Sequence, residues 1–410
     1  MTHEEPLDAT SDFTPGLSEM PSHASAGSPG SVTAAATQAS IGGTVPESSA
    51  DEEDATRAEK KSGGDSATAN MPLIAIGGSA GAFQELQTML AGIPTDFPGV
   101  VCVVLHTSPQ SQLLAENLKR SSAIPVCYAF DGQRLEPGHV YVAPSDYHML
   151  IKEDRLRVIR GPRENHCRPA IDPLFRSAAL AFGDRVRAIV LSGYLDDGAS
   201  GSIAISRCGG QVAVQSPASA SAADMPNNTL SAVDVDFVGT PVQLTRWLVG
   251  SFDEPADKAT ASGSALHDRQ IEREVHISES IESNIPLEQE LGELVAMTCP
   301  ECSGPLWELK VDKVRRYRCH TGHAYTAKSL LAHQDETIET ALWAAMRLMQ
   351  ERANSLEQLA KDNVAGSETF SQRAAESRTN AQVLRSLLVG SCKAETARES
   401  SLPQTQQDHV

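Results

Sequence analysis

Short apolar runs alternate with amphipathic stretches between residues 71 and 250. Runs of this kind, bounded by polar or glycine-rich residues, are typical of buried strands. They occur at Leu73–Ile76, Val100–Leu105, Val140–Val142, Ala188–Leu191 and Val212–Val214. Helical spacing of apolar residues is found at Phe83–Leu90, Leu113–Arg120 and Asp172–Phe182. The alternation predicts an α/β fold with a mainly parallel, doubly wound sheet, in which functional groups gather at the carboxyl ends of the strands.

The alternation of strands and helices is confined to residues 71–250, and the rest of the chain divides into further parts. Residues 1–70 are rich in Ser, Ala, Thr and Gly without a period of apolar residues, which predicts a disordered acidic tail. Residues 251–296 are polar and acidic, and we expect a linker there. Apolar residues at steps of three and four within residues 327–390, with a break at Gly366, predict a helical hairpin. A second disordered tail is expected over residues 391–410.

Negative charge is concentrated outside the predicted α/β domain. The 410-residue chain has a formal net charge of -19; residues 1–70 hold twelve acidic and three basic side chains, and residues 251–295 hold eleven and three. The acidity therefore belongs to tail and linker, and no basic stripe with interleaved aromatics suggests a nucleic-acid partner. The sequence starts without an apolar leader, and its longest apolar run, Val100–Leu105, is too short to span a bilayer. We expect a cytoplasmic protein that is not embedded in a membrane.

The first chemical signal is a Gly-x-Ser-x-Gly pattern at Gly77–Gly81. It follows a predicted strand and precedes a predicted helix, which is the context of a nucleophile elbow. Its central residue, Ser79, would then be a nucleophile, and the backbone N–H of Ala80 could donate to an oxyanion. The other interpretations of this pattern are a phosphate-cradling glycine turn and a plain tight turn.

Two more polar side chains are predicted at the same edge of the sheet. His106 directly follows a buried strand, and Leu191–Gly198 runs from a strand into a loop that holds two carboxylates, Asp196 and Asp197. A carboxylate in this loop could orient the imidazole that activates Ser79. The order of serine, histidine and acid along the chain differs from that of the α/β-hydrolase fold, in which the acid precedes the histidine.

Several further motifs occur in the same order as in a known family. They are Gly77–Gly81, His106–Pro109, Asp131-Gly132, Pro137–Pro144, His166–Asp172, Leu191–Gly198, Gly209–Val212 and Met225-Pro226. Over about residues 72–250 the chain resembles the chemotaxis protein-glutamate methylesterases of the CheB type. The resemblance implies that Ser79 is the nucleophile, His106 the general base and Asp197 the orienting acid. It also implies the fold of the CheB C-terminal domain, and hydrolysis of glutamate γ-methyl esters with release of methanol.

The same resemblance implies the substrate and partners. The substrate would be a methyl-accepting chemoreceptor, with glutamine deamidation at the same site, and methyltransferase or histidine-kinase proteins would be pathway partners. Catalysis would need no cofactor. A receptor-binding scaffold and a general small-ester hydrolase are the alternative functions.

Three features depart from the family pattern. Ala80 stands where Thr is usual, and Tyr194 where Met is usual, although a backbone N–H survives both changes. The best-known members carry an N-terminal receiver domain, and only low-complexity sequence precedes Met71 here. We therefore expect activity without a phosphodonor.

The His166–Asp172 motif has two interpretations. Its polar residues, His166, Arg168 and Asp172, could line the substrate cleft. The interpretation we favour pairs Arg168 with Asp172, so that they brace a loop and cap a helix.

A cluster of cysteines near residue 300 has the spacing of a zinc site. A Cys-x2-Cys knuckle is followed after sixteen residues by a further cysteine and then by histidines. The predicted ligands are Cys299, Cys302, Cys319 and His323. Four protein ligands would make a closed structural site, with His320 as the competing fourth ligand. We predict a zinc-ribbon-like module over residues 297–326, folded by its metal and separable from the esterase domain.

Overall fold

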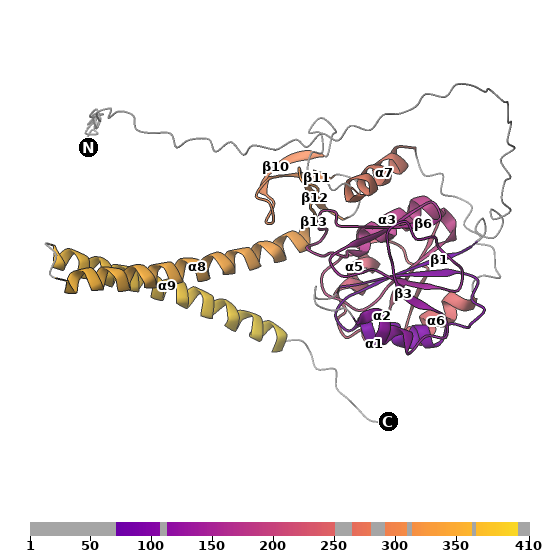
Figure 1. Ribbon diagram of the computed structural model, residues 1–410, viewed down its shortest axis with the longest axis horizontal. Helices are drawn as coiled ribbons and strands as arrows, with labels where there is room; N and C mark the ends of the chain where they lie inside the picture. The colour runs from indigo at the N-terminus through magenta and orange to yellow at the C-terminus, as the bar shows by residue number, and fades with distance from the viewer. Residues whose placement is uncertain are drawn as a thin grey trace, which may run out of the picture. The chain divides into compact units, whose positions relative to one another are not determined.

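The computed structural model describes residues 71–106, 113–250, 265–279, 292–309, 314–362 and 366–400. The predicted tail at residues 1–70 lies outside the described residues, as do parts of the predicted linker and the last ten residues of the chain. Figure 1 shows the α/β domain and the elements that follow it in the chain.

The central sheet has seven strands in the order β3-β4-β2-β1-β7-β8-β9. The strands are β1 (Leu73–Gly78), β2 (Val100–Leu105), β3 (Val126–Tyr128), β4 (Val140–Val142), β7 (Val186–Val190), β8 (Gln211–Gln215) and β9 (Phe237–Gly239). Every neighbouring pair runs parallel, which confirms the predicted sheet. The chain lays down β2 on one side of β1 and returns to the other side with β7, so the winding reverses at β1. In open α/β sheets, ligands bind at such a point, outside the carboxyl ends of the strands.

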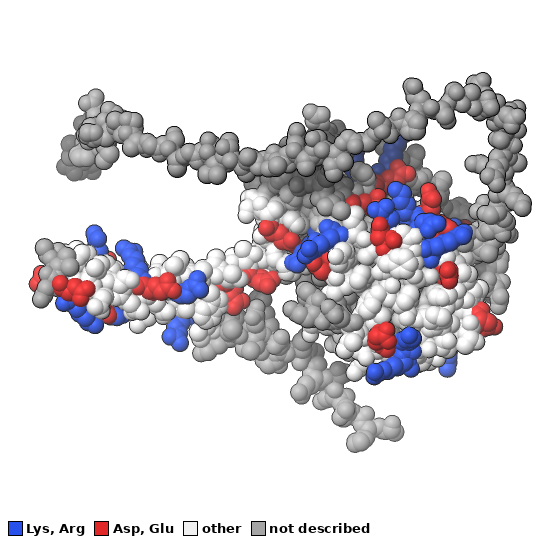
Figure 2. All heavy atoms as spheres, in the orientation of Figure 1, with Lys and Arg blue, Asp and Glu red and all other residues white. Residues whose placement is uncertain are grey.

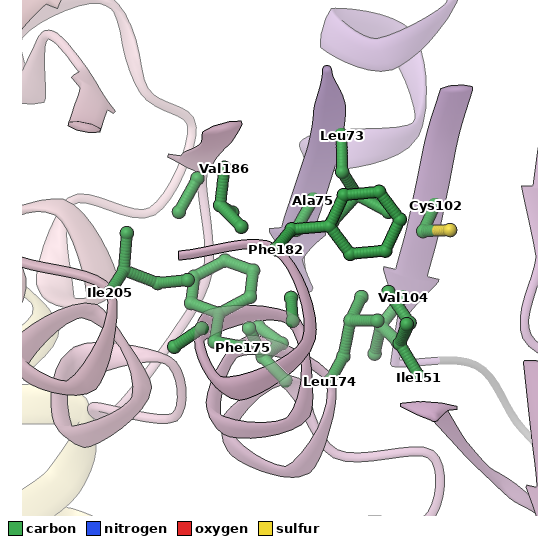
Figure 3. Packing of buried hydrophobic residues seen from close by; sticks show 14 of the residues in the cluster. Leu73, Ala75, Cys102, Val104, Ile151, Leu174, Phe175, Phe182, Val186 and Ile205 are labelled. Atoms are coloured by element: carbon green, nitrogen blue, oxygen red, sulfur yellow. The ribbon is translucent and has the colours of Figure 1, made fainter. Parts of the chain in front are cut away.

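Helices cover both faces of the sheet, which is why its strands are continuous apolar runs. In β1, Leu73 packs in the cluster that holds α3 (Ile171–Phe182), and the next residue, Ile74, packs in the cluster that holds α1 (Ala82–Ala91). Figure 3 shows α3 lying across the strands with its aromatic side chains against them. The other helices of the domain are α2 (Leu114–Lys119), α4 (Ala199–Arg207), α5 (Asp224–Ala232) and α6 (Pro241–Gly250), with 3-10 turns at Gly183–Arg185 and Pro217–Ser219.

A two-stranded antiparallel hairpin, β5 (His148–Lys152) and β6 (Arg155–Ile159), precedes α3 in the chain. It is tied to α3 by a hydrogen bond from the Ile151 N–H to Ser177 Oγ at 3.0 Å. The hairpin leads into residues 160–170, which carry several groups of the candidate site.

The prediction of a plain linker over residues 251–296 is wrong in its middle part. Residues Ala265–Glu279 form helix α7, which packs against α3. One side of α7 is buried through Ile271, Glu274, Ile277 and Ser278. The helix was not predicted because its buried side includes a charged residue, Glu274, and charged residues are ordinarily expected at the surface.

The predicted zinc ribbon and hairpin correspond to ordered elements. Strands β10 (Glu293–Thr298), β11 (Pro305–Leu309), β12 (Arg316–Cys319) and β13 (Ala324–Thr326) form an antiparallel sheet. Helix α8 (Ala327–Lys361) begins directly after β13, and Thr326 caps it by accepting a hydrogen bond from the Ser329 N–H. We call residues 292–309 and 314–362 together the C-terminal module.

Helix α9 (Ser367–Ser400) packs along α8, as the predicted hairpin requires. It continues past residue 390, so the tail predicted to begin at residue 391 is helical up to Ser400. Along α8 and α9, Figure 2 shows acidic and basic side chains interspersed on the visible face, without an extended patch of one sign among the described residues. Among the described helices, none has the length and apolar content needed to span a bilayer.

Candidate active site

Ser79 lies on the sharp turn between β1 and α1. Its N–H donates to the Ser192 carbonyl at 2.8 Å, and its own carbonyl accepts from the first turn of α1 at 3.1 Å. Gly81 has φ 83, a left-handed conformation that disfavours residues with a side chain and that lets the chain turn directly into the helix. The strand, turn and helix predicted for a nucleophile elbow are therefore present.

The parallel register brings His106 next to this turn. Gly78 pairs with Leu105, so the residues that follow them, Ser79 and His106, lie side by side at the carboxyl ends of β1 and β2. The His106 N–H donates to the Gly78 carbonyl at 3.1 Å, and this hydrogen bond holds His106 beside the Ser79 turn. The adjacency follows from the pairing of two buried strands.

Asp197, and not its neighbour, is the carboxylate that contacts the imidazole. His106 Nε2 and Asp197 Oδ2 are 2.8 Å apart. The carboxylate of Asp196 instead accepts a hydrogen bond from Thr326 Oγ1 at 2.6 Å. The structure thus separates the two acids that the sequence left adjacent, and it does so in favour of the predicted one.

Asp197 is buried and accepts hydrogen bonds from several donors. Its Oδ2 also accepts from the Ile171 N–H at 2.7 Å, and its Oδ1 accepts from the Asp172 N–H at 3.2 Å and from Asn165 Nδ2 at 3.0 Å. Burial alone would raise the pKa of this carboxyl. The hydrogen bond and charge of His106, followed by the Ile171 and Asn165 donors, outweigh burial and hold the pKa below its ordinary value. These contacts favour the ionised form of the Asp197 carboxyl beside the imidazole.

The other ring nitrogen of His106 points toward Cys167, with Nδ1 and Sγ 3.4 Å apart. Burial lowers the pKa of His106, but the contacts with Cys167 and Asp197 raise it further than burial lowers it. Among the described residues, the Ser79 hydroxyl makes no hydrogen bond to His106. The structure therefore joins histidine and acid, and places the serine beside them without closing the third contact. Such contacts commonly close only when substrate is bound.

Two backbone N–H groups near Ser79 are candidate oxyanion donors. Within the part of the chain that the structure describes, no hydrogen bond uses the N–H of Ala80 or of Tyr194. The residue before Tyr194 is Gly193, where a Cβ would lie 2.9 Å from Ser79 Cβ and 2.3 Å from Met225 Sδ. Only glycine allows this approach, so the Gly193–Tyr194 peptide lies against the nucleophile.

Asn165 is a site residue that the sequence analysis missed. Its amide nitrogen donates to Asp197 Oδ1 and to Asp172 Oδ2, both at 3.0 Å. Its amide oxygen accepts from the Thr326 N–H and from Ser329 Oγ, both at 3.0 Å. Asn165 thereby connects the candidate catalytic acid to the C-terminal module. No sequence pattern marks it, because an Asn in a loop is ordinary and its partners in the C-terminal module lie more than 150 residues away in the chain.

The predicted pairing of Arg168 with Asp172 is wrong. Arg168 instead pairs with Asp146, through its Nε at 2.9 Å and its Nη2 at 2.6 Å. Asp172 accepts from the N–H groups of Gly198 at 3.1 Å and Gly201 at 2.6 Å. Burial, with the nearby charge of Asp197, raises the pKa of Asp172 to about 7. Asp172 therefore braces the loop of the catalytic acid, while Arg168 braces the loop on which it lies.

A buried charge network joins α3, α7 and β12 beneath this loop. Glu164 is paired with Arg176 at 2.5 Å and with Arg318 at 3.2 Å, and Glu274 is paired with Arg316 at 2.5 Å. Burial would raise the pKa of Glu164, but the charges of its arginine partners, with Arg176 first, hold it well below the ordinary value. The C-terminal module thus shares buried ion pairs with the α/β domain.

The predicted zinc ligands come together in this module. The ligand atoms of Cys299, Cys302, Cys319 and His323 all lie within 4.8 Å of one another. The sulfurs of Cys302 and Cys319 are 3.6 Å apart, and His323 Nδ1 lies 3.5 Å from Cys319 Sγ and 3.7 Å from Cys299 Sγ. Tetrahedral Zn²⁺ with its usual bond lengths places its ligand atoms about 3.4–3.8 Å apart. The four side chains therefore have the chemistry and spacing of a closed zinc site.

The second ring nitrogen of His323 also has a partner suited to a metal ligand. His323 Nε2 lies 3.2 Å from Glu301 Oε2, and a carboxylate in this place fixes the orientation of a metal-binding imidazole. His320, the competing ligand, packs instead against Gly304. The geometry therefore favours His323.

Comparisons with known proteins concern the α/β domain. Residues 74–248 match the family model of the CheB methylesterase. The chain is 40% identical over 164 residues to protein-glutamate methylesterase/protein-glutamine glutaminase 1 of Rhodospirillum rubrum, covering 38% of this chain and 42% of that protein. It is 37% identical over 170 residues to the corresponding protein of Trichodesmium erythraeum, covering 40% and 48%.

Among solved structures, the chain resembles the crystal structure of the Thermotoga maritima CheB methylesterase catalytic domain. The identity is 27%, the TM-score is 0.43, and the match covers 44% of this chain and 98% of that one. The chain spans somewhat less than half the length of the curated relatives described above. The family-model match ends at residue 248, before α7 and the C-terminal module. Residues 74–248, which match the CheB methylesterase family model, hold the Ser79 turn, His106 and Asp197 at one sheet edge.

Proposed function

We propose that this protein is a serine esterase that hydrolyses glutamate γ-methyl esters of methyl-accepting chemoreceptors and releases methanol. The observation that carries the proposal is the buried His106–Asp197 pair, 2.8 Å apart, beside the Ser79 turn of a CheB methylesterase domain. The printed names of the curated relatives include glutamine glutaminase. Deamidation at the same site therefore belongs to the proposal, as do a cytoplasmic location and methyltransferase or histidine-kinase partners.

We infer one step of the reaction for each group. Nε2 of His106 is engaged by Asp197, so Nδ1 is the nitrogen that takes the proton of Ser79 as its hydroxyl attacks the ester carbonyl. Asp197 stabilises the imidazolium, which returns this proton to the leaving methoxide. The N–H groups of Ala80 and Tyr194 would hold the oxyanion. Water then attacks the acyl-enzyme by the same route and releases the glutamate side chain.

Cys167 provides a sharp test of which atom is the nucleophile, because its sulfur lies 3.4 Å from His106 Nδ1. Methanol release from methylated receptor should be abolished in Ser79→Ala and largely retained in Cys167→Ser. The opposite outcome would make Cys167 the nucleophile, with a thioester acyl-enzyme as the intermediate, and refute the role of Ser79. Comparing the methylated receptor with a small soluble methyl ester separates a receptor enzyme from a general esterase. Receptor binding without turnover by the unsubstituted chain would indicate a scaffold.

We also propose that Cys299, Cys302, Cys319 and His323 hold one structural Zn²⁺, and that catalysis uses no cofactor. Support comes from the ligand spacing and from the Glu301 contact on His323. Bound metal would supply folding energy to a module whose own apolar cluster is small. Purified full-length protein should lose this ion in Cys302→Ser. Unchanged metal content in that variant would refute the assignment.

A further inference from the structure

A second group of metal-type side chains lies where the active-site loop meets α8. His166 follows Asn165 in the loop, and His333 and Glu336 are three residues apart on α8. The imidazole rings of His166 and His333 are adjacent, with their centroids 3.9 Å apart and their planes tilted by 37°. Because the loop and the helix lie so far apart in sequence, only the folded chain brings these three side chains together.

Their spacing is close to that of ligands around one ion. Glu336 Oε2 lies 3.7 Å from His166 Nε2 and 3.6 Å from His333 Nδ1. All three ligand atoms lie within 4.8 Å of one another. Bonds of about 2.0–2.1 Å in a tetrahedral site would place nitrogen and oxygen ligands about 3.4 Å apart. Two of the three separations are thus within a few tenths of an ångström of the bound geometry.

One of the two candidate ligand nitrogens is also left without a hydrogen-bond partner. His333 Nδ1, which faces Glu336, is buried and has no hydrogen bond in the described structure. The side chain of His333 is 11% exposed. Carboxylate contacts of 3.6–3.7 Å are too long to be hydrogen bonds, so the ion pairs with Glu336 do not satisfy these rings. His333 Nδ1 faces the Glu336 carboxylate without forming a hydrogen bond to it, so a cation could bind between them.

The backbone supports a constrained role for this loop. Asn165 and His166 both have positive φ, 50° and 63°. Consecutive residues with side chains in this region are uncommon and require stabilisation by their surroundings. Asn165 is held by hydrogen bonds to Asp197 and Thr326, and the side chain of His166 is thereby presented to α8.

We propose that His166, His333 and Glu336 form a second divalent metal site, distinct from the Cys₃His cluster, for Zn²⁺ or a similar nitrogen-preferring ion. Two imidazoles and one carboxylate are a known zinc donor set that leaves a fourth position for water. Glu336 is 67% exposed, which gives the ion access from solvent. A metal here would tie the loop of Asn165 and Cys167 to the start of α8.

Glu301 places the two metal sites in contact. Its Oε2 faces His323 at 3.2 Å, and its Oε1 faces His166 Nδ1 at 3.6 Å. Glu301 therefore contacts the imidazole of His323, as a carboxylate behind a metal-bound histidine does, and it would orient His166 as well after a shift of a few tenths of an ångström. The two ions would then bind with coupled affinities.

The test is metal counting on the folded full-length chain. Protein stripped by a chelator and dialysed against Zn²⁺ should hold two ions per chain. His333→Ala and Glu336→Gln should each hold one, with unchanged helical circular dichroism. The matched control is Asp335→Asn, which changes the adjacent exposed acid on α8 and should hold two.

Cobalt identifies which ion is lost. After Co²⁺ replacement, the thiolate charge-transfer band of the Cys₃His cluster should persist in His333→Ala, while the weaker visible bands of the nitrogen- and oxygen-ligated ion disappear. Two results would overturn the proposal. One is a single ion in the unsubstituted chain that His333→Ala leaves in place. The other is the same metal content in His333→Ala and Asp335→Asn.

Discussion

Asn165→Ala tests whether the C-terminal module takes part in catalysis. The change removes an amide that donates to Asp197 and Asp172 and accepts from Thr326 and Ser329. It leaves His106 and Ser79 untouched. Asp197 Oδ1 keeps only the Asp172 N–H donor, at 3.2 Å, and the link to α8 is lost.

The expected effect follows from the value of a hydrogen bond to a charged group. Such a bond contributes about 1.5–3 kcal/mol, which corresponds to a factor of roughly 10 to 100 when it acts on the reactive state of the acid. Complete loss of the orienting carboxylate costs about 10⁴ in kcat in serine proteases. Because His106 and Ile171 still contact Oδ2, Asn165→Ala should lower kcat by about 10- to 100-fold. KM should change little, because Asn165 is buried.

The pH profile distinguishes a positioning effect from a general loss of structure. Asn165 is among the groups that hold the pKa of Asp197 below its ordinary value. Its removal raises that pKa, so the acid is protonated at a higher pH and the acidic limb of the rate profile should shift upward. The assay is methanol release from methylated receptor between pH 4 and 9, with the exposed Asn227→Ala as control. Unchanged kcat and an unchanged acidic limb in Asn165→Ala would refute the reasoning.

Three further changes probe the site and the network beneath it. Asp197→Asn should lower kcat by several orders of magnitude and Asp196→Asn by far less, and equal losses in methanol release would refute the assignment of the acid. Gly193→Ala should nearly abolish turnover while the protein stays folded, because the added methyl group would fall 2.3 Å from a methionine sulfur and 2.9 Å from the nucleophile's Cβ; normal turnover would contradict this packing. Glu164→Gln should destabilise the chain by about 3–5 kcal/mol in urea unfolding at pH 7, because buried arginines lose their partner. Because the folded-state pKa of Glu164 is lowered, the difference in unfolding free energy between the two chains should be largest above the ordinary Glu pKa and should shrink as pH falls below it. A difference that stays constant down to pH 3 would contradict the ion-pair origin.

The sheet and its polar edge were predictable because they depend on local patterns. Strands buried on both faces are continuous apolar runs, and parallel pairing places whatever follows β1, β2 and β7 at one edge. Ser79, His106 and Asp197 could therefore be placed together without a structure. The choice between Asp196 and Asp197 could not be made from spacing alone, and it depended on family resemblance until the geometry separated them.

The contribution of the C-terminal module was not predictable, because it depends on contacts between polar residues far apart in sequence. Glu164, Glu274 and Arg318 have the sequence character of surface residues, yet they are buried because each neutralises another. Helix α7 was missed for the same reason. Arg168 was assigned the wrong partner because Asp172 is near in sequence, whereas Asp146 is near in space.

Metal removal should lower the activity through Asn165. This differs from the sequence-based expectation that the ribbon is separable from the esterase domain. Thr326 is the last residue of β13, the strand that pairs with β12, so unfolding the ribbon would withdraw the Thr326 N–H and Ser329 Oγ from Asn165. Chelation of the full-length protein should therefore lower kcat, by no more than Asn165→Ala does. In the Asn165→Ala background chelation should have little further effect, since two perturbations that act through one residue are not additive. Full activity after verified metal loss would show that the module is separable. Additive losses would show that the metal acts by another route.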